Sequence, residues 1–342
     1  MNPQAERPGR ATTAPETPPT DQARPSVMPP GPRGPLVVLI GPTGVGKSEL
    51  SLQLAARFQG EIINADSRQV YRELDIATAK PTPQERARIP HHLFDFREPD
   101  NPLTLAEYQR LAYATIDAIH ARGHLPLLVG GTPLYIRAVV QGLRIPPVPP
   151  HPELRRRLEA QAWEEGPEAL HRTLAQLDPE SARRIDPRNV RRVIRALEIV
   201  LATGQPKSAL EGQRPPPYRI LQIGLTMPRK VLYARIDQRV WRMVQAGLVQ
   251  ETARLLERYT LELPAMTGLG YREIAAHLRG EISLEEAVRR IQAQTHRYVR
   301  HQFSWFRRMA DVEWYPWNPP QVDAVVRRIQ GWLQEGGSGG SG

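Results

Sequence analysis

The sequence contains no cysteine, and this absence removes several kinds of chemistry at once. Disulfides, thiolate zinc sites and a cysteine nucleophile are all excluded. The sequence also lacks an apolar run of the ~18 residues that a membrane-spanning helix needs. Its first residues lack the apolar core of a secretory signal. We therefore expect a soluble, cytoplasmic protein that does not bind membranes.

Lysine is scarce, although the formal net charge is +10. Nearly all the positive charge is therefore arginine, whose planar guanidinium suits phosphate recognition. A basic surface favours a nucleic-acid or anionic-membrane partner. An arginine-rich proteome would produce the same excess on a merely solvated surface, so composition leaves both readings open. Lysine occurs only at Lys47, Lys80, Lys207 and Lys230.

One octapeptide carries the clearest chemical signal. It fits the pattern G-x-x-x-x-G-K-[ST], follows an apolar run at 36–40 and precedes helical spacing at 49–58. Glycines let backbone N–H groups curl around a polyanion, and the start of a helix adds partial positive charge. Lys47 would reach the outer phosphate, and Ser48 would ligate Mg²⁺. The pattern predicts a diphosphate or triphosphate site formed by Gly41, Pro42, Thr43, Gly44, Val45, Gly46, Lys47 and Ser48.

Composition divides the chain at two internal proline clusters, 145–152 and 214–217. Proline ends helices and stiffens connections, and the sequence between the clusters is helical and charged. The beginning is rich in proline and lacks apolar periodicity, which is typical of disorder. We predict a disordered tail at 1–34, the first part of a core at 35–145, a helical insertion at 146–213, the second part of the core at 214–335, and a Gly/Ser linker or tag remnant at 336–342.

Short apolar runs alternate with helical stretches in the proposed core. This alternation is typical of an α/β fold with a parallel sheet. Together with the phosphate loop it predicts the architecture of P-loop NTPases, a parallel sheet flanked by helices, here with a helical insertion domain. The expected strands are 36–40, 61–65, 125–129 and 219–225.

The carboxyl ends of parallel strands are where ligands bind, and three such ends carry unusual residues. The first is the phosphate loop, and the second runs into Asp66. A carboxylate beside a bound phosphate can accept a proton from an incoming nucleophile, so Asp66 is a candidate general base. A helix N-cap and a metal-binding acid are the alternatives. The third strand ends in Gly130 and Gly131, where an ordinary P-loop ATPase carries a carboxylate for Mg²⁺.

These segments together resemble the bacterial tRNA dimethylallyltransferases. The resemblance covers about 36–306 in order, and Ala77 stands where we expect glycine. It rests on the phosphate loop, on the sequences DSRQVY at 66–71, DIATAKP at 75–81, HHLFD at 91–95 and VGGTPLY at 129–135, and on RALE at 195–198, GLGYRE at 268–273, QTHRY at 294–298 and WFR at 305–307.

The resemblance implies prenyl transfer from dimethylallyl diphosphate to N6 of the adenosine 3′-adjacent to the anticodon. Asp66 would take the amine proton, while the phosphate loop and Mg²⁺ on Ser48 would stabilise the diphosphate leaving group. The resemblance also implies that Arg235 clamps the diphosphate, and an exposed helix arginine is the alternative. The expected catalytic residues are Asp66, Ser48, Lys47 and Arg235.

The expected partner is a tRNA anticodon stem-loop, bound by a monomer. The adenosine must be extruded to reach a buried carboxylate, and residues beside Asp66 would contact it. Arginines on two helices would meet RNA phosphates. A solvated turn and solvated arginines are the alternatives, with Tyr298, Val299, Phe306 and Met309 read as core. The tRNA-binding candidates are Asp66, Ser67, Arg68, Gln69, Thr132, Arg191, Arg192, Arg195, Arg297, Arg300 and Arg307.

Three other functions compete with this one. An adenylate isopentenyltransferase would need neither the insertion nor the late basic helix. A P-loop kinase for a small metabolite would need the missing strand-end carboxylate. An RNA-binding module with a vestigial loop would not need an intact Lys47–Ser48 pair. The adjacent residues His91 and His92 would point apart on a strand, so we expect a structural or substrate-positioning role for them rather than one shared metal ion.

Overall fold

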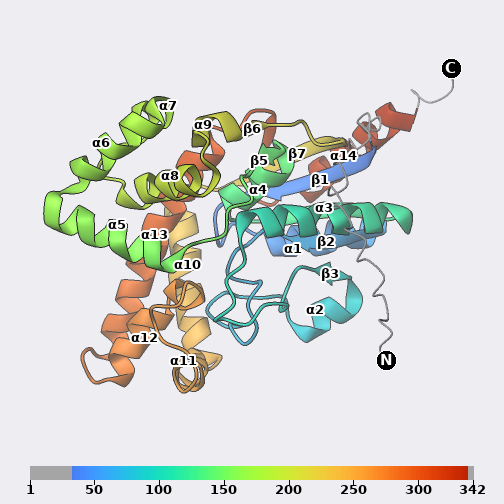
Figure 1. The fold of residues 1–342 in the computed structure, drawn as a ribbon. Coiled ribbons are helices and arrows are strands. Elements are labelled where there is room, and N and C mark those ends of the chain that lie inside the picture. The colour runs from blue at the N-terminus through green and yellow to red at the C-terminus, as the bar shows by residue number, and fades with distance from the viewer. Residues whose placement is uncertain (1–32, 338–342) are drawn as a thin grey trace, which may run out of the picture. The chain divides into compact units, whose positions relative to one another are not determined.

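The computed structural model describes residues 33–337. Its centre is a six-stranded sheet in which every neighbouring pair is parallel. The strand order is β3-β2-β4-β1-β7-β8, which confirms the predicted parallel α/β sheet (Figure 1). The strands are β1 Arg33–Ile40, β2 Gly60–Asn64, β3 His91–His92, β4 Leu125–Gly130, β7 Tyr218–Thr226 and β8 Val312–Pro316.

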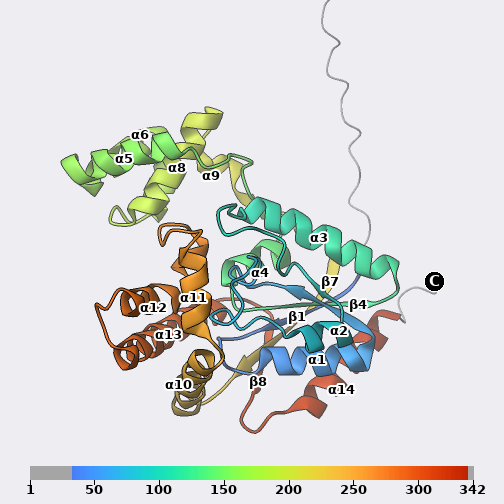
Figure 2. The same ribbon diagram turned by 90° about the horizontal axis from the view of Figure 1, so that it is seen from below.

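Helices cover both faces of this sheet because alternate residues of β1 point in opposite directions. Val38 packs with helices α3 (Leu105–Ala121) and α4 (Pro133–Val140). Leu39 packs with α1 (Lys47–Phe58) and α14 (Val322–Gly337) on the other face. Figure 2 shows α3 and α1 on opposite sides of the strands. Such burial on both faces explains why the central strands are almost continuously apolar.

The remaining core helices follow the sheet strands. Helix α10 (Arg229–Gln245) packs against α13 (Leu284–Phe306) and α11 (Leu248–Leu256), and α12 (Tyr271–Leu278) also contacts α11 and α13. The short helix α2 spans Pro83–Arg88, and a 3₁₀ turn, η1, spans Ala265–Thr267. Helices α10 to α13, from the late part of the chain, thus form one packed group of helices.

The helices between the proline clusters share an apolar cluster of their own, which includes Leu170, Leu174 and Leu197. The small antiparallel pair β5 (Leu143–Arg144) and β6 (Gly212–Gln213) joins the two ends of this segment. The proposed domain boundaries stay a prediction. The helices are α5 Pro152–Glu165, α6 Pro167–Leu177, α7 Pro179–Arg184, α8 Val190–Thr203 and α9 Lys207–Leu210.

Two elements extend beyond the residues expected for them. Strand β1 begins at Arg33 rather than at residue 36, and Arg33 pairs with Tyr218 across an irregularity in the ladder. Helix α14 continues to Gly337, two residues into the expected linker. The rest of the predicted tail and linker lies outside the described residues. Within 33–337, no helix is both long and apolar enough to cross a membrane.

Candidate active site

The phosphate loop connects β1 to α1, as predicted. Gly41, Gly44 and Gly46 have φ values of +148°, +80° and +115°, a region that side chains other than glycine rarely adopt. The glycines also leave no room for a side chain, since a Cβ on Gly46 would lie 2.7 Å from Nε1 of Trp317. The loop therefore ends with backbone amides at the positive end of α1.

Lys47 is held inside this loop. Its Nζ donates to the carbonyl oxygens of Gly41 and Pro42, both at 2.9 Å. Desolvation lowers the pKa of Lys47 to about 8, with Asp66 opposing that shift and Arg239 adding to it. Burial disfavours the charged form of a lysine, and an anion bound nearby would favour that charged form.

Asp66 follows β2, and its backbone is fixed by Asn64. The Asn64 side chain accepts from the Asp66 N–H at 2.8 Å and donates to the Asp66 carbonyl at 3.0 Å. Oδ1 of Asp66 accepts from the Arg68 N–H at 2.9 Å. The next helix, α2, begins only after Thr82, which caps it. The N-cap alternative for Asp66 is therefore wrong, and the carboxylate closes a short turn with one oxygen.

The other oxygen of Asp66 faces Gly131, which directly follows β4. A Cβ on Gly131 would lie 3.9 Å from Asp66 Oδ2 and 3.8 Å from Lys47 Nζ, so both groups border the same point. A Cβ on Gly130 would lie 2.1 Å from the carbonyl oxygen of Ala65. The close approach of β2 and β4 thus excludes any carboxylate side chain at residue 130. This is the physical reason for the glycine where an ATPase has an acid.

Two cavities share lining residues that include Asp66. The first has a volume of about 690 Å³ and is bordered by the phosphate loop, α2 and α10. The second, of about 330 Å³, has a largely apolar wall that includes Val240, Met243 and Leu269. Both cavities are lined by Thr43, Asp66, Thr78 and Arg239.

Helix α10 contributes more than the predicted Arg235. Arg235 is exposed and lines the first cavity, together with Arg239 and Arg242. Arg239 lies at the junction of the cavities. Burial lowers its pKa, and Asp66 opposes that shift. Sequence reasoning missed Arg239, although the spacing of the three arginines places them on one helical face.

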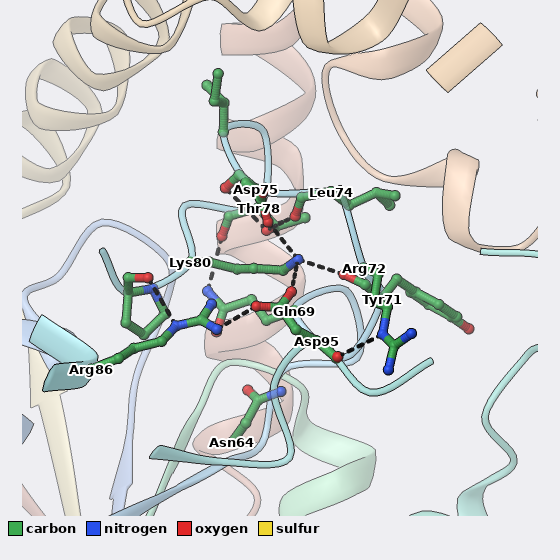
Figure 3. A network of polar contacts seen from close by, with 12 residues as sticks. Asn64, Gln69, Tyr71, Arg72, Leu74, Asp75, Thr78, Lys80, Arg86 and Asp95 are labelled. Carbon is green, nitrogen blue, oxygen red and sulfur yellow. Dashed lines mark hydrogen bonds and ion pairs between the residues drawn. The ribbon is translucent and has the colours of Figure 1, made fainter. Parts of the chain in front are cut away.

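The segment from Asp66 to Pro81 forms a wall of both cavities and is held by ion pairs around the buried Lys80. Figure 3 shows Lys80 lying between Asp75 and Asp95. Lys80, whose side chain is 2% exposed, pairs with Asp75 at 2.7 Å and also with Asp95. Asp95 pairs in turn with Arg86 of α2. Although burial alone would raise the pKa of Asp95, hydrogen bonds from Lys80 and Arg86 hold it below its usual value.

Glu251 of α11 holds the same segment from the opposite side. It is 2% exposed and accepts from the N–H groups of Asp75, Ile76 and Ala77 at 3.2, 2.8 and 3.3 Å. It also accepts from the Tyr271 hydroxyl at 2.8 Å. A single carboxylate thus satisfies four donors that water cannot reach easily.

Replacing Glu251 by glutamine should lower the free energy of unfolding by about 2 kcal/mol, because an amide nitrogen would then face donors. Urea denaturation measures this change. Glu257→Gln is the matched control, since Glu257 is exposed at the end of the same helix, and it should change stability little. Equal stability of the two variants would contradict the anchoring role.

The residues predicted to contact the base lie near Asp66, and several of their side chains form hydrogen bonds within the protein. Arg68 donates to the Pro264 carbonyl and to Thr267 Oγ1 at 2.9 Å. Gln69 Nε2 donates to the carbonyls of Thr78 and Ala79 at 2.9 and 3.2 Å. Thr132 Oγ1 accepts from the Ser67 N–H at 2.9 Å. Arg68, Ser67 and Asp66 line the second cavity, and Gln69 lines the first.

Five arginines of the predicted RNA surface are exposed in the described part of the chain. Arg191, Arg192, Arg297 and Arg300 are exposed on α8 and α13, as is Arg307 just after α13. The reading of Val299, Phe306 and Met309 as core agrees with their burial. Tyr298 differs, since it is 37% exposed and lines the second cavity.

Arg195 corrects one prediction, because it does not project outward with Arg191 and Arg192. It pairs with Glu198 at 2.5 Å and donates to the Val148 carbonyl at 2.8 Å. Glu198 is fully buried. Burial alone would raise its pKa, but hydrogen bonds from Arg155, the His151 N–H and Arg195 hold the pKa at about 2. Arg195 therefore pairs with a buried carboxylate inside the insertion.

The two adjacent histidines meet different partners. His91 Nδ1 lies 2.7 Å from the Ile89 carbonyl, and His92 Nε2 lies 2.5 Å from Glu61. No group of three or more His, Asp or Glu side chains within 33–337 is arranged to hold a metal ion. Ser48, the one predicted metal ligand, is exposed and lines the first cavity.

Similar proteins were found by sequence and by structure. The IPP transferase family model matches residues 69–309, a range that begins after the phosphate loop. A tRNA dimethylallyltransferase from Thermomicrobium roseum is 55% identical over 305 residues, 89% of this chain and 93% of that protein. One from Dehalococcoides mccartyi is 44% identical over 320 residues, 93% of this chain and 98% of that protein.

Two solved structures share the fold. The tRNA isopentenylpyrophosphate transferase from Bacillus halodurans is 41% identical with a TM-score of 0.65, covering 88% of this chain and 97% of that one. A eukaryotic dimethylallyltransferase described as acting on tRNA is 27% identical with a TM-score of 0.76, covering 89% of this chain and 80% of that one. The resemblance drawn from the motifs is confirmed, and the chain belongs to the IPP transferase family, that of the tRNA dimethylallyltransferases.

Proposed function

We propose that this chain is a cytoplasmic, monomeric enzyme that moves the dimethylallyl group of dimethylallyl diphosphate to N6 of the adenosine 3′-adjacent to a tRNA anticodon. The placement of Asp66 supports this proposal best. Its Oδ2 borders the same point as Lys47 Nζ, at the junction of a cavity bordered by the phosphate loop and a cavity with apolar walls.

The reaction breaks the allylic C1–O bond and forms a bond from N6 to C1. Diphosphate leaves with the electron pair of the broken bond, and the proton of the attacking amine goes to Asp66. Lys47 and the loop amides stabilise the charge that grows on the leaving group. Arg235 and Arg239 of α10 line the same cavity as the phosphate loop, where they would contact the diphosphate.

The phosphate loop suits a magnesium–diphosphate complex. Mg²⁺ prefers oxygen ligands and is commonly held by one protein group, substrate phosphates and waters. Ser48 offers such an oxygen at the start of α1. When bound, Mg²⁺ would neutralise part of the diphosphate charge. Ser48 would hold the ion while Lys47 and the amides bind the phosphates directly.

The adenosine would reach Asp66 by leaving its stack in the anticodon loop. Arg68 and Ser67 line the second cavity next to Asp66, while Gln69 and Thr132 support the turn that places it. These side chains already form hydrogen bonds within the protein. They would therefore form part of the cavity wall that receives the base. Tyr298 offers an aromatic ring on the same cavity, on which a base can stack.

A metabolite kinase is one competing function. Its strand-end carboxylate has no room here, because a Cβ on Gly130 would lie 2.1 Å from the Ala65 carbonyl oxygen. An adenylate isopentenyltransferase would use the same chemistry on a free nucleotide. Incubation with labelled dimethylallyl diphosphate and either tRNA or AMP distinguishes the candidates. Label transfer to tRNA is expected, and transfer to AMP alone would overturn the proposal.

Replacing Arg297, Arg300 and Arg307 together by alanine should weaken tRNA binding and flatten its salt dependence. Each lost phosphate contact should reduce the slope of log affinity against log salt by about 0.7–0.9. Filter binding of tRNA at several salt concentrations measures both effects, and binding of dimethylallyl diphosphate should not change.

A second triple variant controls for charge alone. Arg57, Arg110 and Arg327 are exposed on α1, α3 and α14, and their replacement by alanine removes the same charge from other surfaces. This variant should keep the slope close to that of the unmodified protein. If both triple variants bind tRNA equally well, the α13 arginines are only solvated. The pair Arg191 and Arg192 can be tested in the same way.

A further inference from the structure

Gln302 of α13 connects two loops that lie far apart in the sequence. Its Oε1 accepts from the Thr43 N–H of the phosphate loop at 2.9 Å. Its Nε2 donates to the carbonyl oxygen of Gly131, just after β4, at 2.7 Å. The side chain is 2% exposed, so water does not compete easily for either bond. One buried amide thus spans the gap between the phosphate loop and the glycines beside Asp66.

The two partners require a glutamine. A backbone N–H can only donate and a backbone carbonyl can only accept, which fixes the orientation of the amide. Glutamate would place a carboxylate oxygen against the Gly131 carbonyl, and methionine would serve neither partner. Asparagine offers the same groups on a side chain one carbon shorter. The bridge therefore depends on both the length and the chemistry of residue 302.

The glycine at position 131 fits this bridge. A Cβ there would lie 2.7 Å from Gln302 Nε2, and a side chain would push the amide away. The same point lies 3.8 Å from Lys47 Nζ and 3.9 Å from Asp66 Oδ2. The Gln302 amide therefore borders the same point as the group that would hold the diphosphate and the group that would take the amine proton.

We propose that Gln302 is a positioning residue that sets the phosphate loop relative to the end of β4 and to Asp66. This inference rests on the proposed function. In prenyl transfer the loop places the leaving group and Asp66 places the amine, so the two loops define the line of attack. A misplacement of about 1 Å in such an arrangement can cost about 10²-fold in rate. Lys47 and the other loop amides would still bind the donor without the bridge.

Gln302→Met should lower kcat by about 10- to 100-fold and leave KM for dimethylallyl diphosphate within about threefold. Methionine keeps the volume of the side chain but breaks both hydrogen bonds. Gly131→Ala should shift kcat in the same direction by displacing the amide. Gln302→Glu should also raise the donor KM, because it adds a negative charge beside the diphosphate. Gln245→Met, at an exposed glutamine on α10, is the matched control and should leave both constants unchanged.

The melting temperature and amide hydrogen exchange complete the test. A purely structural role would lower the melting temperature and the active fraction without changing kcat of the folded enzyme. Exchange at the Thr43 amide should be slow in the unmodified protein and faster in Gln302→Met. The proposal is overturned if Gln302→Met and Gly131→Ala keep kcat within twofold, or if Thr43 exchanges equally fast in both proteins. An unmodified protein that fails to prenylate tRNA contradicts the proposed function instead, while the exchange measurement still decides whether the bridge exists.

Discussion

Asp66→Asn should lower the single-turnover rate of prenyl transfer by about 10²–10⁴, with the affinity for dimethylallyl diphosphate changed by no more than a few-fold. The two effects separate because the amine meets Asp66, whereas the diphosphate meets the phosphate loop. Asparagine keeps an oxygen that can accept from the Arg68 N–H, so the turn closed by Oδ1 survives. What is lost is a carboxylate able to take the proton. Rapid-quench measurement with enzyme in excess over tRNA isolates this step.

Two comparisons make the Asp66 result interpretable. Asp323→Asn changes an exposed carboxylate on α14, and it should leave the rate unchanged. Binding of inorganic diphosphate by Asp66→Asn should match that of the unmodified protein. If Asp66→Asn turns over at a near-normal rate, Asp66 only shapes the turn after β2. The proton would then have to reach another acceptor.

The phosphate loop and the strand ends could be predicted because their signals are local. Gly41 to Ser48 forms its site within one strand–loop–helix unit, so spacing alone locates the amides and Lys47. Asp66 and Gly130 follow apolar runs directly, and neighbouring parallel strands bring their carboxyl ends together. His91 and His92 were expected to lie on a strand, and they form the edge strand β3. The other edge strand, β8, was not predicted, because its residues are half-buried or exposed and its sequence carries little of the apolar pattern that reveals a strand.

Contacts between distant segments explain what the sequence could not reveal. The face of α10 that meets the phosphate loop depends on how that helix packs against the rest of the protein. Arg235 was predicted from the family resemblance, whereas Arg239, whose position depends on this packing, was missed. Gln302 lies 259 residues from Thr43, and no spacing rule joins them. Arg195 looked exposed because the helical pattern does not show that Glu198, three residues later, is buried and needs cations. Local chemistry was therefore easier to predict than the docking of the late helices.

Lys47→Met should lower kcat by about 10²–10³ and also weaken donor binding. Lys47 lies where the loop would hold the diphosphate, and charge on that leaving group grows as the C1–O bond breaks, so the cation stabilises the transition state more than the ground state. Methionine keeps most of the side-chain stem while removing the charge, and the loop glycines still fix the backbone. Steady-state kinetics with varied dimethylallyl diphosphate measure kcat and KM together. Lys230→Met removes an exposed lysine from the start of α10 and should leave both constants unchanged. Unaltered kinetics in Lys47→Met would mean that the loop binds a different ligand, since the Lys47 ammonium lies inside the loop and would contact a diphosphate bound there.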